Sequence, residues 1–162
     1  MIERRYILGG IALGGTMIAA PMLFAKGGKR PVAEPGWRLS DDAWRKRLSP
    51  FEYRVLREAA TERPFTSPLD KEKRAGIFAC AGCGLPLYSS TAKYDSRTGW
   101  PSFWAPLKGA IATSTDYDLG YPRTEVHCRR CGGHLGHVFN DGPKPTGKRY
   151  CMNGTALRFR PA

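Results

Sequence analysis

Histidine, cysteine and acidic residues are all scarce in this chain, and each scarcity narrows the candidate functions. Three histidines and five cysteines supply every imidazole and thiol group. Fourteen acidic residues stand against 26 lysines and arginines, which gives a net charge of +12. A basic surface suits nucleic acid or an anionic membrane, but the cations are scattered, and the only tight run is Arg45, Lys46 and Arg47. We therefore interpret the charge as a solvated surface and expect no nucleic-acid partner.

Internal repeats are also absent, apart from two pairs of cysteines, so the simplest architecture is one globular domain. The length of 162 residues allows one domain with an N-terminal appendage. A domain of this size can bury a core without disulfide bonds. Hydrophobic residues make up 41% of the chain and charged residues 25%, which is typical of globular proteins.

Residues 1–25 are typical of an export signal. Arg4 and Arg5 are followed by an uncharged stretch, rich in glycine and alanine, that continues to Ala25. This arrangement resembles a twin-arginine signal. A membrane anchor is the alternative, since about 20 apolar residues span a bilayer, although four glycines and a proline weaken it. We expect an exported, periplasmic or otherwise extracytoplasmic protein, which an uncleaved signal would anchor in the membrane.

The next segment, residues 26–39, holds three glycines and two prolines, and we predict that it is a linker. Residues 40–162 are predicted to form the single domain. Its first helix signal is Ser40, which precedes two aspartates and is expected to cap a short helix that carries Trp44.

A second, longer helix is predicted to follow Ser49. This serine is a favourable N-cap, the proline after it suits the first helical position, and Glu52 completes a capping box. Leu48 and Tyr53 are expected to form a hydrophobic staple, and the helix is expected to end near Thr61. Its apolar face is predicted to comprise Phe51, Val55, Leu56 and Ala59.

From residue 76 onward, short β-prone runs alternate with glycine and proline, which predicts short antiparallel strands. The fold class is therefore expected to be mainly β, with short helices at the N-terminal end. The predicted strands are the runs GIFAC, LPLY, AIAT, RTEVHC, HVF, RYCMN and ALRF.

Two Cys-x-x-Cys-Gly motifs predict a metal site. Each motif lets both sulfurs point into one tetrahedral site, and the glycine permits the tight turn. Two such pairs supply the four thiolates of a closed structural zinc site. The alternatives are two disulfides, two redox-active motifs or a rubredoxin-like iron centre. We favour zinc that joins two distant hairpins through Cys80, Cys83, Cys128 and Cys131.

Cys151 is the cysteine outside both motifs. A lysine and an arginine directly precede it, and cations favour the thiolate. The spacing of His134, His137 and Asp141 could bring two imidazoles and a carboxylate to one pocket. A thiolate near imidazoles suits nucleophilic catalysis. The alternatives are a buried structural cysteine and a second metal site at the histidines.

The segment 94–104 is rich in aromatic residues and is predicted to be a loop. Exposed aromatic side chains on loops often line a pocket for an apolar ligand group. Packing of these rings into the core is the alternative.

Together, these stretches resemble the methionine-R-sulfoxide reductase family. The resemblance covers about residues 40–160 and implies two antiparallel sheets in a barrel-like arrangement, short N-terminal helices and a structural zinc. It also implies reduction of the R epimer of methionine sulfoxide, free or protein-bound. We expect a monomer that uses an external thioredoxin-like thiol as reductant. The matching pieces are EYRVLREAATERPFT, CAGCGLPLY, YDSRTGWPSF, RTEVHCRRCGGHLGHVFNDGPKPTG and RYCMN.

The resemblance also implies roles for single residues. Cys151 matches the nucleophile, which attacks the sulfoxide sulfur and becomes a sulfenic acid. Trp100 matches the aromatic residue that receives the methyl group of the substrate, and Phe139 is expected to help bind the substrate. The residues expected to orient the sulfoxide and help protonate its oxygen are His134, His137, Asp141, Arg149 and Asn153.

Two positions depart from the family pattern. Thr98 stands where many members carry a resolving cysteine, and the other four cysteines are committed to the metal. Cys151 is therefore expected to remain a sulfenic acid until an external thiol attacks it. Gly154 stands where serine is common, with no effect that the sequence predicts.

Two rival functions stay open on the sequence alone. A zinc-stapled, basic nucleic-acid-binding module would explain the charge and the metal motifs, but neither the export signal nor the histidines beside Cys151. A thiol–disulfide oxidoreductase that uses Cys151 alone is the second, and activity on a disulfide rather than a sulfoxide would distinguish it.

Overall fold

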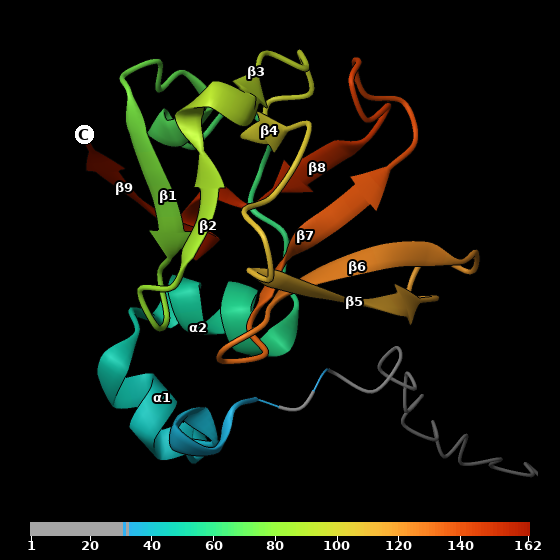
Figure 1. Ribbon diagram of the computed structural model, residues 1–162. Coiled ribbons are helices and arrows are strands. Elements are labelled where there is room, and N and C mark those ends of the chain that lie inside the picture. The colour runs from blue at the N-terminus through green and yellow to red at the C-terminus, as the bar shows by residue number, and fades with distance from the viewer. Residues whose placement is uncertain (1–30, 32) are drawn as a thin grey trace, which may run out of the picture.

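The computed structural model describes residue 31 and residues 33–162 of the chain (Figure 1). The predicted signal or anchor, residues 1–25, lies outside the described residues, as does part of the predicted linker. Within the described part, no helix combines the length and the apolar character needed to cross a membrane.

The end of the predicted linker contacts the domain. A single 3-10 turn, η1 (Pro35–Trp37), lies in this segment. The N–H of Glu34 donates to the carbonyl oxygen of Arg130 at 2.9 Å, and the ring of Trp37 stacks on Trp44 at 6.3 Å. These contacts place the segment against the turn that carries the second cysteine pair.

Two short α-helices follow, α1 (Asp41–Arg47) and α2 (Pro50–Glu58). Ser40 caps α1 as predicted, because its hydroxyl accepts a hydrogen bond from the N–H of Ala43, and the helix carries Trp44, which is buried. The capping box predicted at the start of α2 is confirmed: Ser49 and Glu52 exchange side chain-to-backbone hydrogen bonds.

The end and the apolar face of α2 differ from the prediction. The helix ends at Glu58 rather than near Thr61, because Ala59 adopts a left-handed conformation with φ of 56°. Phe51 is 37% exposed and lies against the guanidinium of Arg54. Val55 and Leu56 are buried as predicted, and Tyr53 is buried with them.

The described residues form two antiparallel sheets, with strand orders β2-β1-β9 and β3-β4-β8-β7-β6-β5. A mainly β fold with two antiparallel sheets and short N-terminal helices is thus confirmed. The strands β1 and β6 match the predicted runs GIFAC and RTEVHC residue for residue. The bounds are β1 (Gly76–Cys80), β2 (Pro86–Ser89), β3 (Lys93–Tyr94), β4 (Ser102–Phe103), β5 (Ile111–Asp116), β6 (Arg123–Cys128), β7 (His134–Phe139), β8 (Arg149–Met152) and β9 (Leu157–Pro161). Three further 3-10 turns are η2 (Pro68–Asp70), η3 (Ser90–Ala92) and η4 (Gly154–Ala156).

A group of stacked aromatic side chains joins the two sheets. Phe103 of β4 stacks on Tyr88 of β2 with ring centroids 4.3 Å apart, and Phe78 of β1 meets Phe103 edge-on at 5.0 Å. All three side chains are fully buried. Figure 1 shows the smaller sheet on the left, strands β5 to β7 on the right and α2 below them. Burial of these rings fixes the two sheets relative to each other.

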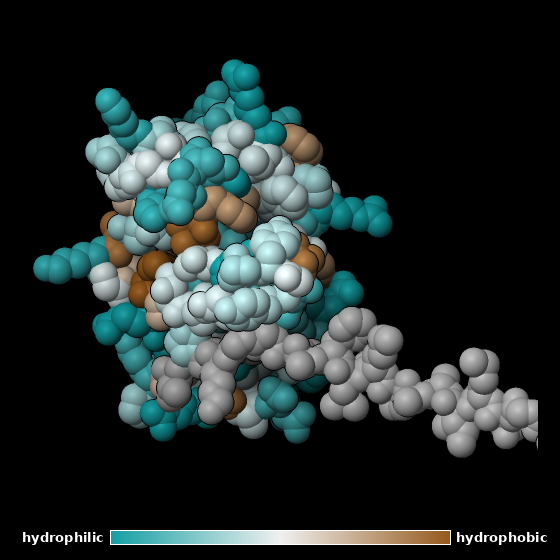
Figure 2. Space-filling model, turned by 90° about the vertical axis from the view of Figure 1, so that its right-hand side faces the viewer, coloured by the Kyte–Doolittle hydropathy of each residue, from teal (hydrophilic) through white to brown (hydrophobic). Residues whose placement is uncertain are grey.

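The surface is mixed in hydropathy. On the face shown in Figure 2, hydrophobic side chains form small groups between hydrophilic ones. The exposed large hydrophobic residues include Tyr117, Leu119 and Tyr121 in the turn between β5 and β6.

Candidate functional site

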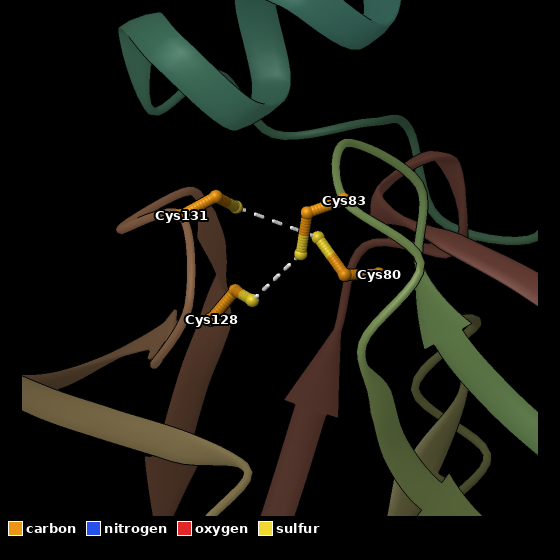
Figure 3. Close-up of side chains that lie close together, drawn as sticks. All are labelled: Cys80, Cys83, Cys128 and Cys131. Carbon is orange, nitrogen blue, oxygen red and sulfur yellow. Dashed lines mark hydrogen bonds between the residues drawn. The ribbon is translucent and has the colours of Figure 1, made fainter. Parts of the chain in front are cut away.

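Four buried cysteine side chains converge beneath the N-terminal helices (Figure 3). Cys80 ends β1 and Cys83 lies in the turn after it, while Cys128 ends β6 and Cys131 lies in the turn after that strand. The sulfur atoms of Cys80 and Cys131 are 3.7 Å apart, and those of Cys83 and Cys128 are 3.5 Å apart. All four sulfurs lie within 4.8 Å of one another.

These sulfur distances fit a tetrahedral metal site. A metal–sulfur bond of about 2.3 Å places the sulfurs of a tetrahedron about 3.8 Å apart, whereas a disulfide joins two sulfurs at about 2.05 Å. The four thiols are free of disulfides. The predicted gathering of both cysteine pairs around one site is confirmed, and the four side chains can hold one metal ion.

The two cysteine turns have the same local structure. Gly84 and Gly132 adopt left-handed φ angles of 72° and 66°, and each donates its N–H to the carbonyl oxygen of the first cysteine of its motif. A side chain at these positions would be strained. The glycine after each pair is therefore the residue that lets both sulfurs face the same point.

Arginines from the helices donate to the cysteine turns. Arg47 Nε donates to the carbonyl oxygen of Gly82 at 2.7 Å, and Arg57 Nη1 donates to that of Cys131 at 3.1 Å. Figure 3 shows a helix lying across the cysteine cluster. These cations lie where four thiolates would concentrate negative charge, so they favour metal binding.

Cys151 lies on β8, between β4 and β7 of the larger sheet. Its backbone partners are Ser102 on one side and His137 on the other. Gly136 has φ of 154°, and a Cβ atom there would lie 2.1 Å from the carbonyl oxygen of Cys151. Only glycine therefore allows β7 to approach β8 closely enough for this pairing.

The thiol of Cys151 is half-buried, and its burial raises its pKa. Hydrogen bonding from Thr98 and the charge and hydrogen bonding of Arg149 act in the opposite direction without overcoming burial. Arg149 therefore favours the thiolate as the sequence predicted, but burial has the larger effect on the pKa. Lys148, the other preceding cation, donates to the side chain of Asn140 at 2.6 Å.

Beside Cys151, His137 is held by a carboxylate that the sequence analysis did not identify. His137 Nε2 lies 2.6 Å from Asp116 Oδ2, and Arg123 Nη2 lies 2.5 Å from the same oxygen. Burial opposes ionisation of Asp116, but the N–H of Asp118 and the imidazole outweigh it and lower the pKa of Asp116. The ionised carboxylate accepts the Nε2–H of His137. Burial also lowers the pKa of His137 itself, which keeps the ring neutral near pH 7.

His134 is fully buried behind His137, and their ring centroids are 5.5 Å apart. His134 Nδ1 donates to Glu125 Oε1 at 2.6 Å. Burial opposes ionisation of Glu125, but hydrogen bonds from His127 and His134 hold its pKa well below its usual range. The carboxylate therefore fixes the tautomer of His134, whose Nε2 faces Asn153 Nδ2 at 3.5 Å.

Asp141 pairs with an arginine, whereas other carboxylates pair with the two histidines. It forms a two-point ion pair with Arg149, at 3.0 and 2.8 Å, and its side chain is 61% exposed. The guanidinium of Arg149 also stacks over the ring of Phe139 at 4.4 Å. Asp141 therefore orients Arg149, whereas Asp116 and Glu125 orient the imidazoles.

A cavity of about 140 Å³ opens at the thiol. Trp100, Phe139, His137, Asn153 and Cys151 line it, together with Thr61, Arg123 and Gly136. The structure thus brings five of the eight predicted catalytic and substrate-binding residues to one cavity. His134, Arg149 and Asp141 are outside its lining.

The structure shows what surrounds Thr98 and Gly154, the two positions that depart from the family pattern. The hydroxyl oxygen of Thr98 lies 3.9 Å from the sulfur of Cys151, so position 98 is adjacent to the reactive thiol. A Cβ atom on Gly154 would lie 1.9 Å from Ser67 Oγ. Ser67 occupies the space that a serine side chain at position 154 would need, which explains why this chain has glycine there.

Three carboxylates of the site, Asp116, Glu125 and Glu62, were not predicted from the sequence. In the β5–β6 hairpin, Asp116 pairs with Arg123. An acidic and a basic residue on either side of a predicted turn is the sequence signal that could have identified Asp116. Residues 125–128 of β6 are buried on both faces of the sheet, so alternation of polar and apolar residues gave no signal for Glu125. Glu62 lies in the loop after α2, where only the fold explains its burial.

The comparisons with known proteins agree with this site. The SelR domain matches residues 48–161. The peptide methionine sulfoxide reductase MsrB of Leptospira interrogans is 52% identical over 122 residues, which cover 75% of this chain and 93% of that protein. The MsrB proteins of Bradyrhizobium diazoefficiens and Agrobacterium fabrum are 53% and 48% identical, over 75% and 80% of this chain and 88% and 97% of their own lengths. The chain therefore belongs to the family of SelR-domain proteins that includes the peptide methionine sulfoxide reductases MsrB.

Proposed function

We propose that this protein reduces the R epimer of methionine sulfoxide to methionine, with Cys151 as the nucleophile. The observation that carries the proposal is the cavity in which one free thiol, one imidazole and one indole meet. Family membership supports the class of reaction, since the relatives are named as peptide methionine sulfoxide reductases.

The cavity suits the end of a methionine sulfoxide side chain. Its volume of about 140 Å³ accommodates a short side chain rather than a folded segment. Trp100 and Phe139 offer apolar surface for the methyl group, and His137 and Asn153 offer polar groups for the oxygen. Both free and protein-bound sulfoxide fit this arrangement.

The reaction balances with one thiol and one sulfoxide. The sulfur of Cys151 attacks the sulfoxide sulfur, the S–O bond breaks, and the oxygen and the thiol proton end on Cys151 as a sulfenic acid. The sulfoxide sulfur gains two electrons and leaves as methionine, while Cys151 loses two.

His137 transfers the proton in this proposal. The ring is neutral at rest because burial lowers its pKa, and the Cys151 thiol is protonated because burial raises its pKa. As the sulfur attacks, the proton passes to the imidazole and then to the sulfoxide oxygen, which is a poor leaving group until it is protonated. Asp116, 2.6 Å from His137 Nε2, stabilises the transient imidazolium.

We further propose that the four-cysteine site holds zinc. A closed site of four thiolates leaves no open position for substrate, so zinc would stabilise the fold and take no part in the reaction. The ligands Cys80, Cys83, Cys128 and Cys131 would join the end of β1 to the end of β6.

Recycling is proposed to need an external, thioredoxin-like thiol. Thr98 offers no second sulfur beside Cys151. The external thiol attacks the sulfenic acid and releases water, which leaves a mixed disulfide that a second thiol reduces. Because residues 1–25 resemble an export signal, we propose that the protein acts outside the cytoplasm, on oxidised exported proteins.

Turnover of resolved R and S sulfoxides by the wild type and by Cys151→Ser tests the central proposal. The wild type is expected to reduce the R epimer, and Cys151→Ser is expected to be inactive while it keeps its fold and metal. Full turnover by Cys151→Ser, or reduction of a disulfide in place of the sulfoxide, would exclude the mechanism.

A further inference from the structure

Glu62 is a buried carboxylate, 3% exposed, in the loop after α2. Within residues 33–162 no cation forms an ion pair with it. Three donors instead satisfy it: the N–H of Gly154 at 2.5 Å, and the N–H and the hydroxyl of Thr155 at 2.9 and 2.7 Å. A buried carboxylate is costly unless hydrogen bonds stabilise it, so this arrangement ties Glu62 firmly to η4, the 3-10 turn that follows β8.

The backbone of Glu62 forms hydrogen bonds with two side chains that line the cavity. Trp100 Nε1 donates to the carbonyl oxygen of Glu62 at 3.1 Å, and the N–H of Glu62 donates to Asn153 Oδ1 at 3.0 Å. Side chains that are 53 positions apart in the sequence therefore share one anchor.

The contact with Asn153 also orients its amide. With Oδ1 accepting from Glu62, Nδ2 is directed to the carbonyl oxygen of Leu135 at 3.2 Å and toward His134 Nε2 at 3.5 Å. The amide orientation and the His134 tautomer are thus fixed by one network with Glu62 at one end and Glu125 at the other.

A second hydrogen bond clamps the Trp100 loop. The N–H of Phe65 donates to the carbonyl oxygen of Gly99 at 2.7 Å. Both residues adopt left-handed backbones, with φ of 63° and 85°, and a Cβ on Gly99 would lie 2.6 Å from the Phe65 nitrogen. The loop 61–67 therefore packs closely against the Trp100 loop, and the Glu62 carboxylate fastens it to η4.

We propose that Glu62 is a positioning residue for sulfoxide reduction. Its carboxylate anchors the loop 61–67, and the anchored backbone holds the indole of Trp100 and the amide of Asn153 in the geometry that the substrate requires. The expected effect of Glu62 on the reaction rate rests on the proposed function, but the effect of Glu62 on the Trp100 indole can be measured without substrate.

Glu62→Gln is the informative variant, because it keeps the size of the side chain but replaces one accepting oxygen with a donating NH₂ group. One amide NH₂ must then face a backbone N–H or the Thr155 hydroxyl. We expect kcat/KM for the R sulfoxide to fall at least tenfold, with a raised KM. Alkylation of Cys151 by iodoacetamide needs only the thiol and is expected to change less than twofold. In NMR spectra, the indole N–H of Trp100 is expected to exchange with solvent at least tenfold faster.

Glu52→Gln is the matched control. Glu52 is a capping carboxylate that accepts from Ser49 and Arg158 and does not line the cavity. The Glu52→Gln substitution is expected to lower the melting temperature without changing kcat/KM or the exchange rate of the Trp100 indole N–H. If Glu62→Gln does not fold, Thr155→Val removes one donor to Glu62, and smaller changes in the same direction are expected.

The results separate two kinds of failure. An inactive wild type refutes the proposed function, and the exchange of the Trp100 indole then still decides the role of Glu62. Unchanged exchange and an unchanged kcat/KM in a folded Glu62→Gln variant would overturn the inference. Equal losses of activity in Glu62→Gln and Glu52→Gln would also overturn it, because both would then reflect stability alone.

Discussion

Cys151 and His137 face each other as a registered pair across β8 and β7, and both side chains line one cavity. Asp116 holds the imidazole through Nε2 at 2.6 Å. The strand pairing therefore places the protonated thiol of Cys151 beside the neutral imidazole of His137. The carboxylate of Asp116 stabilises this imidazole when it becomes protonated.

This relationship predicts that His137→Ala lowers the rate of sulfoxide reduction by about 10² to 10⁴, the usual range for the loss of a general acid–base group. Asp116→Asn is expected to lower it by about tenfold, because an amide still accepts the hydrogen bond but cannot stabilise the imidazolium. Single-turnover rates with the R sulfoxide measure both effects. A His137→Ala variant with the wild-type rate would remove the imidazole from the mechanism.

The protonation of Cys151 can be followed by its alkylation with iodoacetamide as a function of pH. Burial raises the pKa of Cys151, so the half-maximal rate is expected above about pH 8.5, the ordinary value for cysteine. Arg149 lowers the pKa, so Arg149→Met is expected to move the midpoint to still higher pH and to slow alkylation at pH 7. A midpoint below pH 8, located on Cys151 by peptide mass, would contradict this prediction.

The metal site predicts one zinc per chain. Cys80→Ser is expected to lower the free energy of unfolding by several kcal/mol, because metal binding and folding are coupled. Elemental analysis and chemical denaturation of the wild type and the variant measure these effects. Soluble, folded wild-type protein that contains neither zinc nor iron would be incompatible with the assignment.

The position of Thr98 predicts the fate of the oxidised enzyme. After one turnover without reductant, Cys151 is expected to be a sulfenic acid that a dimedone-type reagent traps, with the zinc retained. Because the Thr98 hydroxyl lies 3.9 Å from the thiol, Thr98→Cys is expected to form an internal disulfide with Cys151. Mass spectrometry distinguishes the two products. A disulfide between Cys151 and another cysteine in the zinc-loaded wild type would rule out recycling by an external thiol alone.

Export remains a prediction from the first 25 residues. Replacement of Arg4 and Arg5 by lysine is expected to block twin-arginine transport and to retain the protein in the cytoplasm. Cell fractionation of the wild type and the double variant measures this. A wild type found entirely in the cytoplasm would show that the segment is not an export signal.

Local chemistry determined much of the fold from the sequence. The capping box at Ser49 and Glu52 and the glycines after both cysteine pairs involve residues within a few positions of each other. Such short-range hydrogen bonds and backbone preferences hold in almost any tertiary setting, so they could be predicted. The two-residue strands β3 and β4 were not predicted, because two residues are too few to show a periodicity.

The tertiary structure alone decided which carboxylates serve the site. Spacing suggested Asp141 as the partner of the histidines, but the sheet brings Asp116 to His137 and Glu125 to His134. Strand register joins residues that lie far apart in the sequence, and no local pattern encodes it. The net direction of the pKa shift of Cys151 could not be predicted for a similar reason. Neighbouring cations are visible in the sequence, whereas burial, which has the larger effect here, depends on how the whole chain packs around the thiol.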